Sequence, residues 1–293
     1  MLYRVAEALT RPSQAVAYAR SRVVESLFWN EYFDVLREPK TRGFVHSDDA
    51  KANRIAENLR LHGVPVRDYD VDVADFKRYL SRANYPEYWP YYDGGRAPKF
   101  IEKALEHYLA ARSLDLSNVD VYVDVANDRS PTPEIYRKIS GCISYRQDLA
   151  FAPGLNGDRI GGDAASIPLP DGFASKLALH CSFEHFEGES DIGFIREASR
   201  VLRPGGRLCI VPLYLNETYA IQTNPALMAK GGIEFERDAH LFCAPGWRNR
   251  HNRYYDVSHF VDRIVRNLHG LELSLDFVRN QSDVDPACYV KFV

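Results

Sequence analysis

From about Asp120 onward, the sequence alternates between short apolar runs and amphipathic segments, and this alternation constrains the fold more than any other feature. The strand-like runs lie at residues 119–126, 142–149, 175–182 and 206–215. Helical spacing of apolar residues recurs between them. The run "GRLCIVPLYL" is apolar on both faces, as expected of a central parallel strand. The pattern therefore predicts an α/β fold built on a doubly wound, mostly parallel sheet.

The N-terminal third has a different pattern, in which apolar residues recur at helical spacing. Helices are expected at residues 13–38, 48–64, 73–83 and 98–114, the last with Pro98 at its start. The aromatic stretch "NYPEYWPYYDGG" interrupts this series and reads as a loop, packed either over a site or against a neighbouring domain. We expect a helical N-terminal region over residues 1–95 and a second domain over 96–293, which ends in a strand pair.

Composition narrows the class of protein. The 293 residues are 45% hydrophobic and carry a formal net charge of −3, which gives no general attraction to nucleic acid. No run of about 18 apolar residues occurs, so no transmembrane span is expected. The five scattered cysteines form no CxxC pair, which favours reduced thiols in a cytoplasmic protein over zinc or disulfides. No metal site is expected, and the sequence does not indicate the oligomeric state.

The stretch from Gly161 to Leu215 is the most specific part of the chain. An acid in "GDA" precedes a short "IPLPDG" turn, a strand runs into "FEHF", and a helix ends in "RVLRPGGRL" before the next strand. In this order the segments resemble the class I S-adenosylmethionine-dependent methyltransferases, especially those that act on small molecules. The resemblance implies a seven-stranded, Rossmann-like sheet and S-adenosylmethionine as the cofactor. It covers roughly Asp120 to Val293 and leaves the N-terminal third unexplained.

The resemblance also assigns residues to the methyl donor. Asp163 would accept a hydrogen bond from the adenine amino group beside the Ala164 N–H; the alternative is a solvated turn aspartate that caps the next element. Asp148, which ends the second strand, would bind the ribose hydroxyls. Asp124 would orient the loop after the first strand. His180 and His185 flank the end of the fourth strand and would line the donor pocket, although either could equally be structural.

The loop in "YVDVANDRSPTPE" departs from the family, which usually has glycines there. Ala126 stands where the first glycine is expected, and Asp128 and Ser130 occupy the later positions. Two interpretations stay open. The segment is a variant ligand loop whose free N–H groups face the donor at the start of the next helix, or the domain is a degenerate form that no longer binds it.

The segment at about 215–254 is polar and aromatic, and in the family the corresponding insert covers the acceptor. His240 and His251 are the candidate bases, because histidine is the usual proton acceptor at neutral pH. The candidate acceptor-binding residues are Tyr214, Trp247, Arg250, Arg253 and Tyr254. We expect O-methylation of a small polar or glycan-like acceptor. A catalytically inactive scaffold and a Rossmann oxidoreductase are the alternatives; the absence of GxGxxG counts against the latter.

Overall fold

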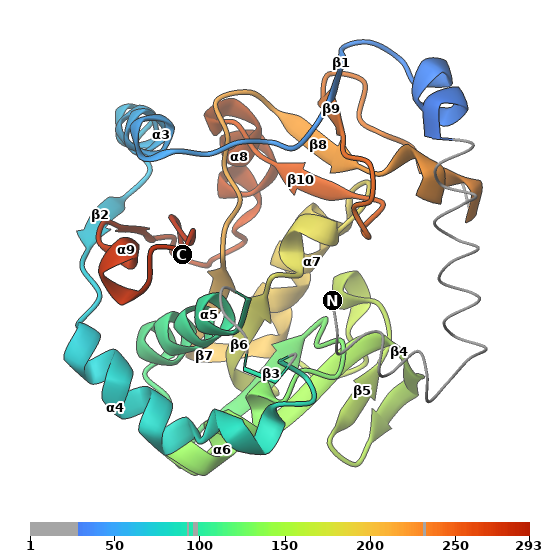
Figure 1. Ribbon diagram of the computed structural model, residues 1–293. Helices are drawn as coiled ribbons and strands as arrows, with labels where there is room; N and C mark the ends of the chain where they lie inside the picture. Colours follow the sequence, from blue (N-terminus) through green and yellow to red (C-terminus); the bar gives the residue numbers. More distant parts are fainter. Residues whose placement is uncertain (1–28, 93, 96–98, 231–232) are drawn as a thin grey trace, which may run out of the picture. The chain divides into compact units, whose positions relative to one another are not determined.

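The computed structural model describes residues 29–92, 94–95, 99–230 and 233–293 (Figure 1). The chain divides into two compact units, which are described separately. Unit 1 combines residues 1–46 with 218–254, and unit 2 combines residues 47–217 with 255–293. The helix expected at 13–38 lies outside the described residues as far as residue 28; residues 29–35 are helical.

Unit 1 contains a four-stranded sheet that the sequence did not indicate. Its order is β1 (Lys40–Arg42), β9 (His240–Cys243), β8 (Ala220–Thr223) and β10 (Asn252–Tyr254). The first three strands pair in parallel and β10 pairs antiparallel to β8, while a 3₁₀ turn, η4 (Pro225–Lys230), follows β8. Strands of three or four residues are too short to show a two-residue period, and β1 lies far from its partner in the sequence.

Unit 2 contains a five-stranded sheet in the order β5, β4, β3, β6, β7, in which β4, β3, β6 and β7 pair in parallel. Residues 146–148 of β4 also pair in parallel with β5; the register is then irregular, and residues 153–156 pair with β5 in the reverse direction. The strands are β3 (Val121–Val125), β4 (Ile143–Asn156), β5 (Arg159–Gly161), β6 (Ala174–His180) and β7 (Leu202–Val211). The chain starts at the central strand, moves out to one edge and then returns to build the other side. The predicted doubly wound sheet is therefore confirmed.

The C-terminal segment extends this series. The Leu213 N–H, just beyond β7, donates to the carbonyl of Phe292. Val293 and β11 (Leu275–Val278) exchange backbone hydrogen bonds through Asp276, and Phe277 forms an antiparallel bridge with Phe292. The C-terminal residues thus lie between β7 and β11, as the predicted strand pair requires. A strand missed by the sequence, β2 (Val66–Tyr69), pairs in parallel with β11.

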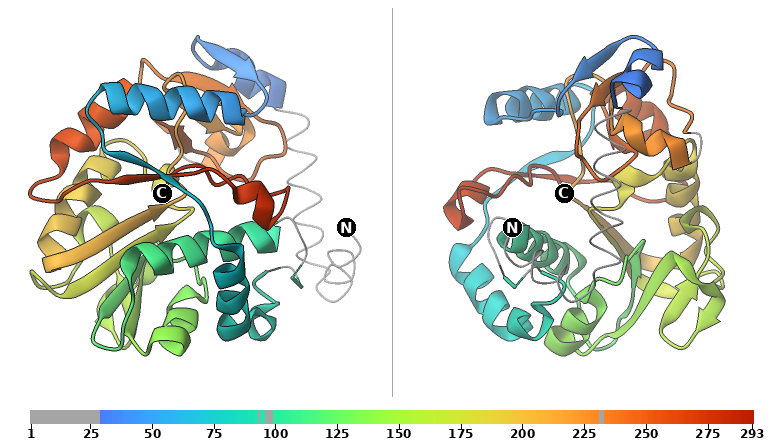
Figure 2. Two further views of the ribbon diagram at one scale, coloured as in Figure 1. Left: turned by 90° about the vertical axis from the view of Figure 1, so that its left-hand side faces the viewer. Right: turned by 45° about the vertical axis from the view of Figure 1, so that its right-hand side comes forward.

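The helices of unit 2 lie on both faces of its sheet: α5 and α6 cover one face and α7 the other (Figure 2). The α-helices are α3 (Asp49–Leu61), α4 (Val73–Ala83), α5 (Lys99–Leu114), α6 (Thr132–Ser140), α7 (Ser190–Val201), α8 (Val257–Arg263) and α9 (Gln281–Val284). Short 3₁₀ turns are η1 (Tyr85–Tyr88), η2 (Ala164–Ser166), η3 (Phe183–His185) and η5 (Val265–Asn267). The aromatic stretch expected to be a loop thus contains η1, and its Tyr85 and Tyr92 are buried.

The connection from α7 to β7 contains the "RPGG" residues. The pairing of β6 with β7 shifts between Ala174 and Lys176, so that the "RPGG" residues form an irregularity at the start of the strand. Gly205 has a φ of 76°, a left-handed conformation that glycine adopts without steric cost. These residues therefore shape the entry of the chain into the sheet.

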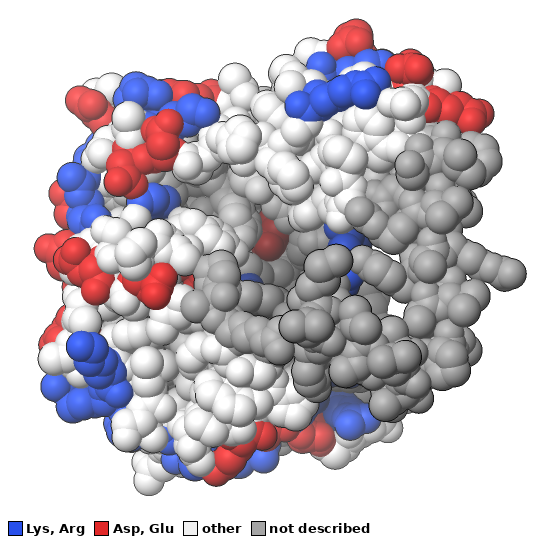
Figure 3. Space-filling model, in the orientation of Figure 1, with Lys and Arg blue, Asp and Glu red and all other residues white. Residues whose placement is uncertain are grey.

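On the face shown in Figure 3, acidic and basic side chains are interspersed over the described surface. Among the described residues, no helix combines the length and apolar character needed to cross a bilayer. A search of the same residues finds no group of three or more His, Cys, Asp or Glu side chains arranged to hold a metal ion.

Candidate functional site

Three of the predicted acids lie at one edge of the unit 2 sheet. Asp124 is the penultimate residue of β3. Asp148 pairs with Gly161 at the end of β5; it does not end its strand as predicted, because β4 continues to Asn156, but the regular parallel pairing of β4 stops there. Asp163 lies two residues after Gly161. Because the carboxyl ends of parallel strands share one edge, the three carboxylates come from neighbouring strand ends, which is where ligands bind in open α/β sheets.

The loop after β3 adopts glycine-like backbone conformations without containing glycine. Ala126, Asp128 and Arg129 have φ values of 52°, 43° and 64°. The left-handed region costs a residue with a Cβ roughly 1–2 kcal/mol, and such strain clusters at ligand sites. Glycines were expected at two of these positions, Ala126 and Asp128, and the backbone there has the left-handed conformation that glycine adopts without steric cost.

Hydrogen bonds within the loop hold this path. The Asn127 side-chain amide donates to Oδ2 of Asp124 at 2.5 Å and to the carbonyl of Ser130 at 3.0 Å. The Ala126 N–H donates to Oε1 of Gln147 at 3.1 Å, and the Asp128 N–H donates to Oδ2 of Asp148 at 2.9 Å. Asp124 and Asp148 therefore brace the loop from two neighbouring strands.

Helix α5 supplies a second support that the sequence did not reveal. His107, which is 1% exposed, places Nε2 3.1 Å from Oγ1 of Thr132 and Nδ1 3.0 Å from the Tyr85 hydroxyl. Oγ1 of Thr132 lies 2.6 Å from Oγ of Ser130 at the end of the loop. In the sequence, His107 is one polar residue in an amphipathic helix, and only its place on the apolar face could have drawn attention to it.

His180, at the end of β6, completes the buried polar group. Its Nε2 lies 3.3 Å from the Tyr122 hydroxyl and 3.7 Å from Oδ1 of Asp124. Burial lowers the pKa of His180 to about 3 and raises the pKa of Asp124 to about 7. Near neutral pH the imidazole is therefore uncharged, and the carboxyl group of Asp124 titrates close to physiological pH.

The loop does not present the row of free N–H groups that the variant-loop interpretation expected. The N–H groups of Ala126, Asn127, Asp128 and Ser130 all donate within the protein. Oδ1 of Asn127 and Nδ1 of His180 are among the buried side-chain atoms that lack a hydrogen bond within the described part of the chain. An ammonium group carries several N–H donors and no acceptor. The loop therefore offers buried acceptors rather than free backbone donors.

The remaining donor-side candidates occupy different environments. Asp148 is half-buried, and its Oδ1 accepts from the Ala150 N–H at 2.8 Å. Asp163 is exposed and caps η2 by accepting from the Ala165 N–H at 2.9 Å, while Ala164 is buried. The His185 side chain is 35% exposed and lies 3.7 Å from Glu184. The cap on η2 uses only one Asp163 oxygen, so an adenine contact stays compatible with it.

The candidate base residues, and all but one of the acceptor-binding candidates, belong to unit 1. Nε2 of His240 lies 2.8 Å from the Thr41 hydroxyl, and His251 is buried. Arg253 is fully buried and forms an ion pair with Glu236. The others in unit 1 are the half-buried Trp247 and Tyr254 and the exposed Arg250. Tyr214 lies in unit 2, where its hydroxyl is 3.6 Å from Sγ of Cys181.

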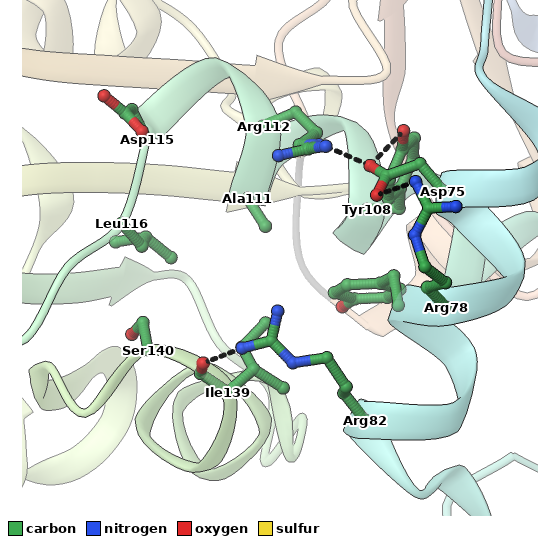
Figure 4. Close-up of a pocket in the computed structure, with 11 residues that line it drawn as sticks. Asp75, Arg78, Arg82, Tyr108, Ala111, Arg112, Asp115, Leu116, Ile139 and Ser140 are labelled. Atoms are coloured by element: carbon green, nitrogen blue, oxygen red, sulfur yellow. Dashed lines mark hydrogen bonds and ion pairs between the residues drawn. The ribbon is translucent and has the colours of Figure 1, made fainter.

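A pocket in unit 2 lies elsewhere, at the far end of α5 (Figure 4). It is lined by α4, the last turns of α5 and the end of α6, and includes Arg78, Arg82 and Arg112. Asp75 accepts hydrogen bonds from Arg78, Arg112 and the Tyr108 hydroxyl. None of the sequence-predicted site residues lines this pocket.

Comparisons with known proteins match part of unit 2. Residues 139–210 match a family model described as a methyltransferase domain, and no curated protein matches the chain. Among solved structures, it is similar to Burkholderia thailandensis 1,6-didemethyltoxoflavin-N1-methyltransferase, with bound 1,6-didemethyltoxoflavin and S-adenosylhomocysteine: 13% identity, TM-score 0.46, covering 78% of this chain and 90% of that one. It is also similar to the YcgJ protein of Bacillus subtilis: 18% identity, TM-score 0.33, covering 43% and 55%. The chain therefore spans about half the length of some of these structures.

Proposed function

Because the chain carries a domain of the class I S-adenosylmethionine-dependent methyltransferases, as its family match and sheet order indicate, we propose that it transfers a methyl group from S-adenosylmethionine to a small acceptor. The observation that carries the proposal is the pair of buried acceptors, Oδ1 of Asn127 and Nδ1 of His180, beside Asp124. An unmet buried polar atom costs about 1–3 kcal/mol, and a ligand that donates a hydrogen bond to each of these two atoms would remove that cost.

In the proposed complex, different residues of unit 2 bind different parts of the donor. Asn127 and His180 accept hydrogen bonds from the ammonium group, and Asp124 holds Asn127 in place. Asp148 binds the ribose hydroxyls, and Asp163 with the Ala164 N–H binds adenine. His185 borders the pocket, and Ala126 and Ser130 define the path of the loop beside the donor. The donor supplies an already activated methyl group, so binding and orientation are the main tasks of the chain.

For the acceptor, we propose O-methylation of a small polar or glycan-like molecule, with His240 or His251 taking its proton. Tyr214, Trp247, Arg250, Arg253 and Tyr254 are the proposed contacts. Aromatic rings that stack and guanidinium groups that form paired hydrogen bonds support this choice. A cytoplasmic location is part of the proposal, and the five cysteines, all free thiols, support it.

Calorimetry with S-adenosylmethionine, S-adenosylhomocysteine and NAD tests the proposed function. We expect heat of binding with the first two ligands and none with NAD. Binding of NAD alone would support the oxidoreductase alternative. Absence of binding to all three ligands would favour the alternative that the protein is a catalytically inactive scaffold.

Asp163 provides the corresponding residue test. Asp163→Ala removes both the proposed adenine contact and the cap of η2, whereas Asp163→Ser keeps a capping oxygen. If the carboxylate binds adenine, both variants weaken binding of S-adenosylhomocysteine by about tenfold, the loss of one hydrogen bond to a charged group. If Asp163 is only a cap, the serine variant retains the affinity of the unmodified protein.

A further inference from the structure

The pocket at the far end of α5 gathers more positive than negative charge. Its lining includes three arginines, Arg78 and Arg82 of α4 and Arg112 of α5, and two acids, Asp75 and Asp115. Asp75 pairs with both Arg78 and Arg112, so one carboxylate serves two guanidinium groups. Within the described part of the chain, Asp115 forms no ion pair with any of these arginines. The lining therefore has an excess positive charge.

The guanidinium groups also have more N–H donors than the pocket has acceptors. Each carries five N–H donors and no acceptor. Arg78 donates through Nη2 to Oδ1 of Asp75 at 3.0 Å, and Arg112 donates through Nη2 to Oδ2 of the same carboxylate. Arg82 donates through Nη2 to the carbonyl of Ile139 (Figure 4). The described hydrogen bonds thus use one nitrogen of each arginine, and an oxyanion would supply acceptors for the others.

Compensation of helix ends explains part of this cluster but not all of it. Arg82 lies in the last turn of α4 and Arg112 in the last turn of α5, where a cation interacts favourably with the helix dipole. Arg78 lies outside the last turn of α4, so the dipole does not account for it. Its side chain is 64% exposed, and an exposed pair with Asp75 contributes little to stability. Arg78 is therefore the arginine that most favours a binding role.

The rest of the lining is largely apolar or aromatic. Tyr79 is 8% exposed and Tyr108 is 2% exposed, and Ala111, Leu116 and Ile139 are half-buried. The cavity has a volume of about 210 Å³, below the roughly 300–1,000 Å³ of pockets that hold drug-sized ligands. Exposed guanidinium groups beside such a wall suit a small molecule with an anionic head and a short apolar body.

We infer that this pocket binds a small organic anion. Its phosphate or carboxylate head would pair with Arg78, Arg82 and Arg112, and its apolar body would contact Tyr79 and Ile139. Phosphate and carboxylate share the geometry that a guanidinium group binds through two parallel hydrogen bonds. The inference goes beyond the proposed function, because none of the proposed donor or acceptor residues lines this pocket.

Calorimetric titration with phenyl phosphate, benzoate and inorganic phosphate tests the site. All titrations are made at one ionic strength and without a methyl donor, so that changes in charge screening do not imitate binding. We expect phenyl phosphate or benzoate to bind at one site with a dissociation constant of about 1 mM or tighter. Inorganic phosphate should bind at least about threefold more weakly, since it has no apolar body. The tighter of the two organic probes identifies the head group.

Arg78→Met keeps a long apolar side chain and removes the guanidinium group, so the affinity for the tighter organic probe should fall by about tenfold. Arg78→Lys keeps the charge but not the planar fork and should lose less. Arg266→Met is the matched control. The Arg266 side chain is 70% exposed and pairs with Asp262 on the same face of a helical segment, and it does not line the pocket. Its affinity for the probe should change by less than about twofold.

The outcomes are independent of the methyltransferase proposal. Absence of saturable binding of both organic probes would overturn the inference, and so would equal losses of affinity in Arg78→Met and Arg266→Met, which would indicate diffuse attraction to surface charge. Equal affinities for inorganic phosphate and the organic probes would also overturn it, since the apolar wall would then contribute nothing. In each case, binding of S-adenosylhomocysteine would leave the proposed function standing.

Discussion

The two ends of helix α5 illustrate different ways of recognising a site. Its first half carries Lys103, Glu106 and His107, which are buried or nearly so and contact the loop and strand ends that bear the predicted donor residues. Its last turns carry Arg112, whose side chain is 58% exposed and which pairs with Asp75 beside the open pocket of Figure 4. One end is closed and polar, and the other is concave and accessible.

The difference lies in what remains unsatisfied. At the pocket end, Asp75 receives Arg78, Arg112 and Tyr108, and Arg82 donates to the carbonyl of Ile139. Exposed pairs of this kind contribute little energy, since solvent screens them. At the first end, Oδ1 of Asn127 and Nδ1 of His180 are buried without hydrogen-bond partners. The neighbouring loop also has strained, left-handed backbone angles. Buried groups without partners are costly, so the proposed donor site rests on the two beside Asp124 rather than on concave shape.

The largest expected effect concerns the pH dependence of stability at the closed end. Burial raises the pKa of Asp124 to about 7, so between about pH 4 and 7 the folded state holds a proton that the unfolded state has released. This group therefore makes the free energy of unfolding decrease as pH rises. His180, whose pKa is lowered to about 3, acts in the opposite direction between about pH 3 and 6.5, because there the unfolded state binds the extra proton.

In Asp124→Asn the decreasing contribution disappears, and the free energy of unfolding should rise relative to the unmodified protein by about 1.4 kcal/mol per pH unit between pH 4 and 7. His180→Asn should change the slope with the opposite sign between about pH 3 and 6.5. Denaturant unfolding at several pH values measures both. Parallel curves for all three proteins would show that the Asp124–His180 pair does not titrate as its burial requires.

The next effect concerns donor affinity. Asn127→Ala removes the bond to Asp124 and the open Oδ1, so the affinity for S-adenosylhomocysteine should fall by about ten- to a hundredfold, the value of one or two hydrogen bonds involving charge. Asn267→Ala is the matched control, because its amide bonds the carbonyls of Asp262 and Arg263 away from the donor loop. Equal affinities in the two variants would contradict the role of the closed end in donor binding.

The sequence predicted the doubly wound sheet, the helices α3 to α7 and the neighbouring strands that carry or precede the three acids, because these follow from local periodicity. It could not predict how the loop is held. His107 reaches Thr132 only because α5 packs across the strand ends, and this packing leaves no local pattern. The strands of unit 1 were not predicted for a similar reason, because β1 pairs with β9, some two hundred residues away. Long-range partners decide these features, and a single sequence does not encode them at a fixed spacing.

A smaller effect tests the strain in the loop. Ala126→Gly relieves a left-handed φ of 52° but increases the freedom of the unfolded chain, so the protein should become more stable by about 0.5–1 kcal/mol. Ala165→Gly in η2, which does not have a positive φ, should destabilise by a similar amount. Thermal or denaturant unfolding measures both. A loss of stability in Ala126→Gly would mean that the loop does not keep the glycine-like path. Backbone strain would then no longer support the closed end as the donor site.

The smallest effect is expected at the pocket, and it decides which end of α5 is the donor site. Arg82→Met removes a guanidinium group that lines the pocket and keeps a long apolar side chain in its place. Since Arg82 contacts none of the proposed donor residues, the affinity for S-adenosylhomocysteine should change by less than about twofold. The free energy of unfolding should change by no more than about 0.5–1 kcal/mol, as expected for an exposed side chain. A tenfold loss of donor affinity in Arg82→Met, combined with unchanged affinity in Asn127→Ala, would move the donor site to the concave end. It would also show that open shape, rather than unsatisfied buried atoms, marks the site in this protein.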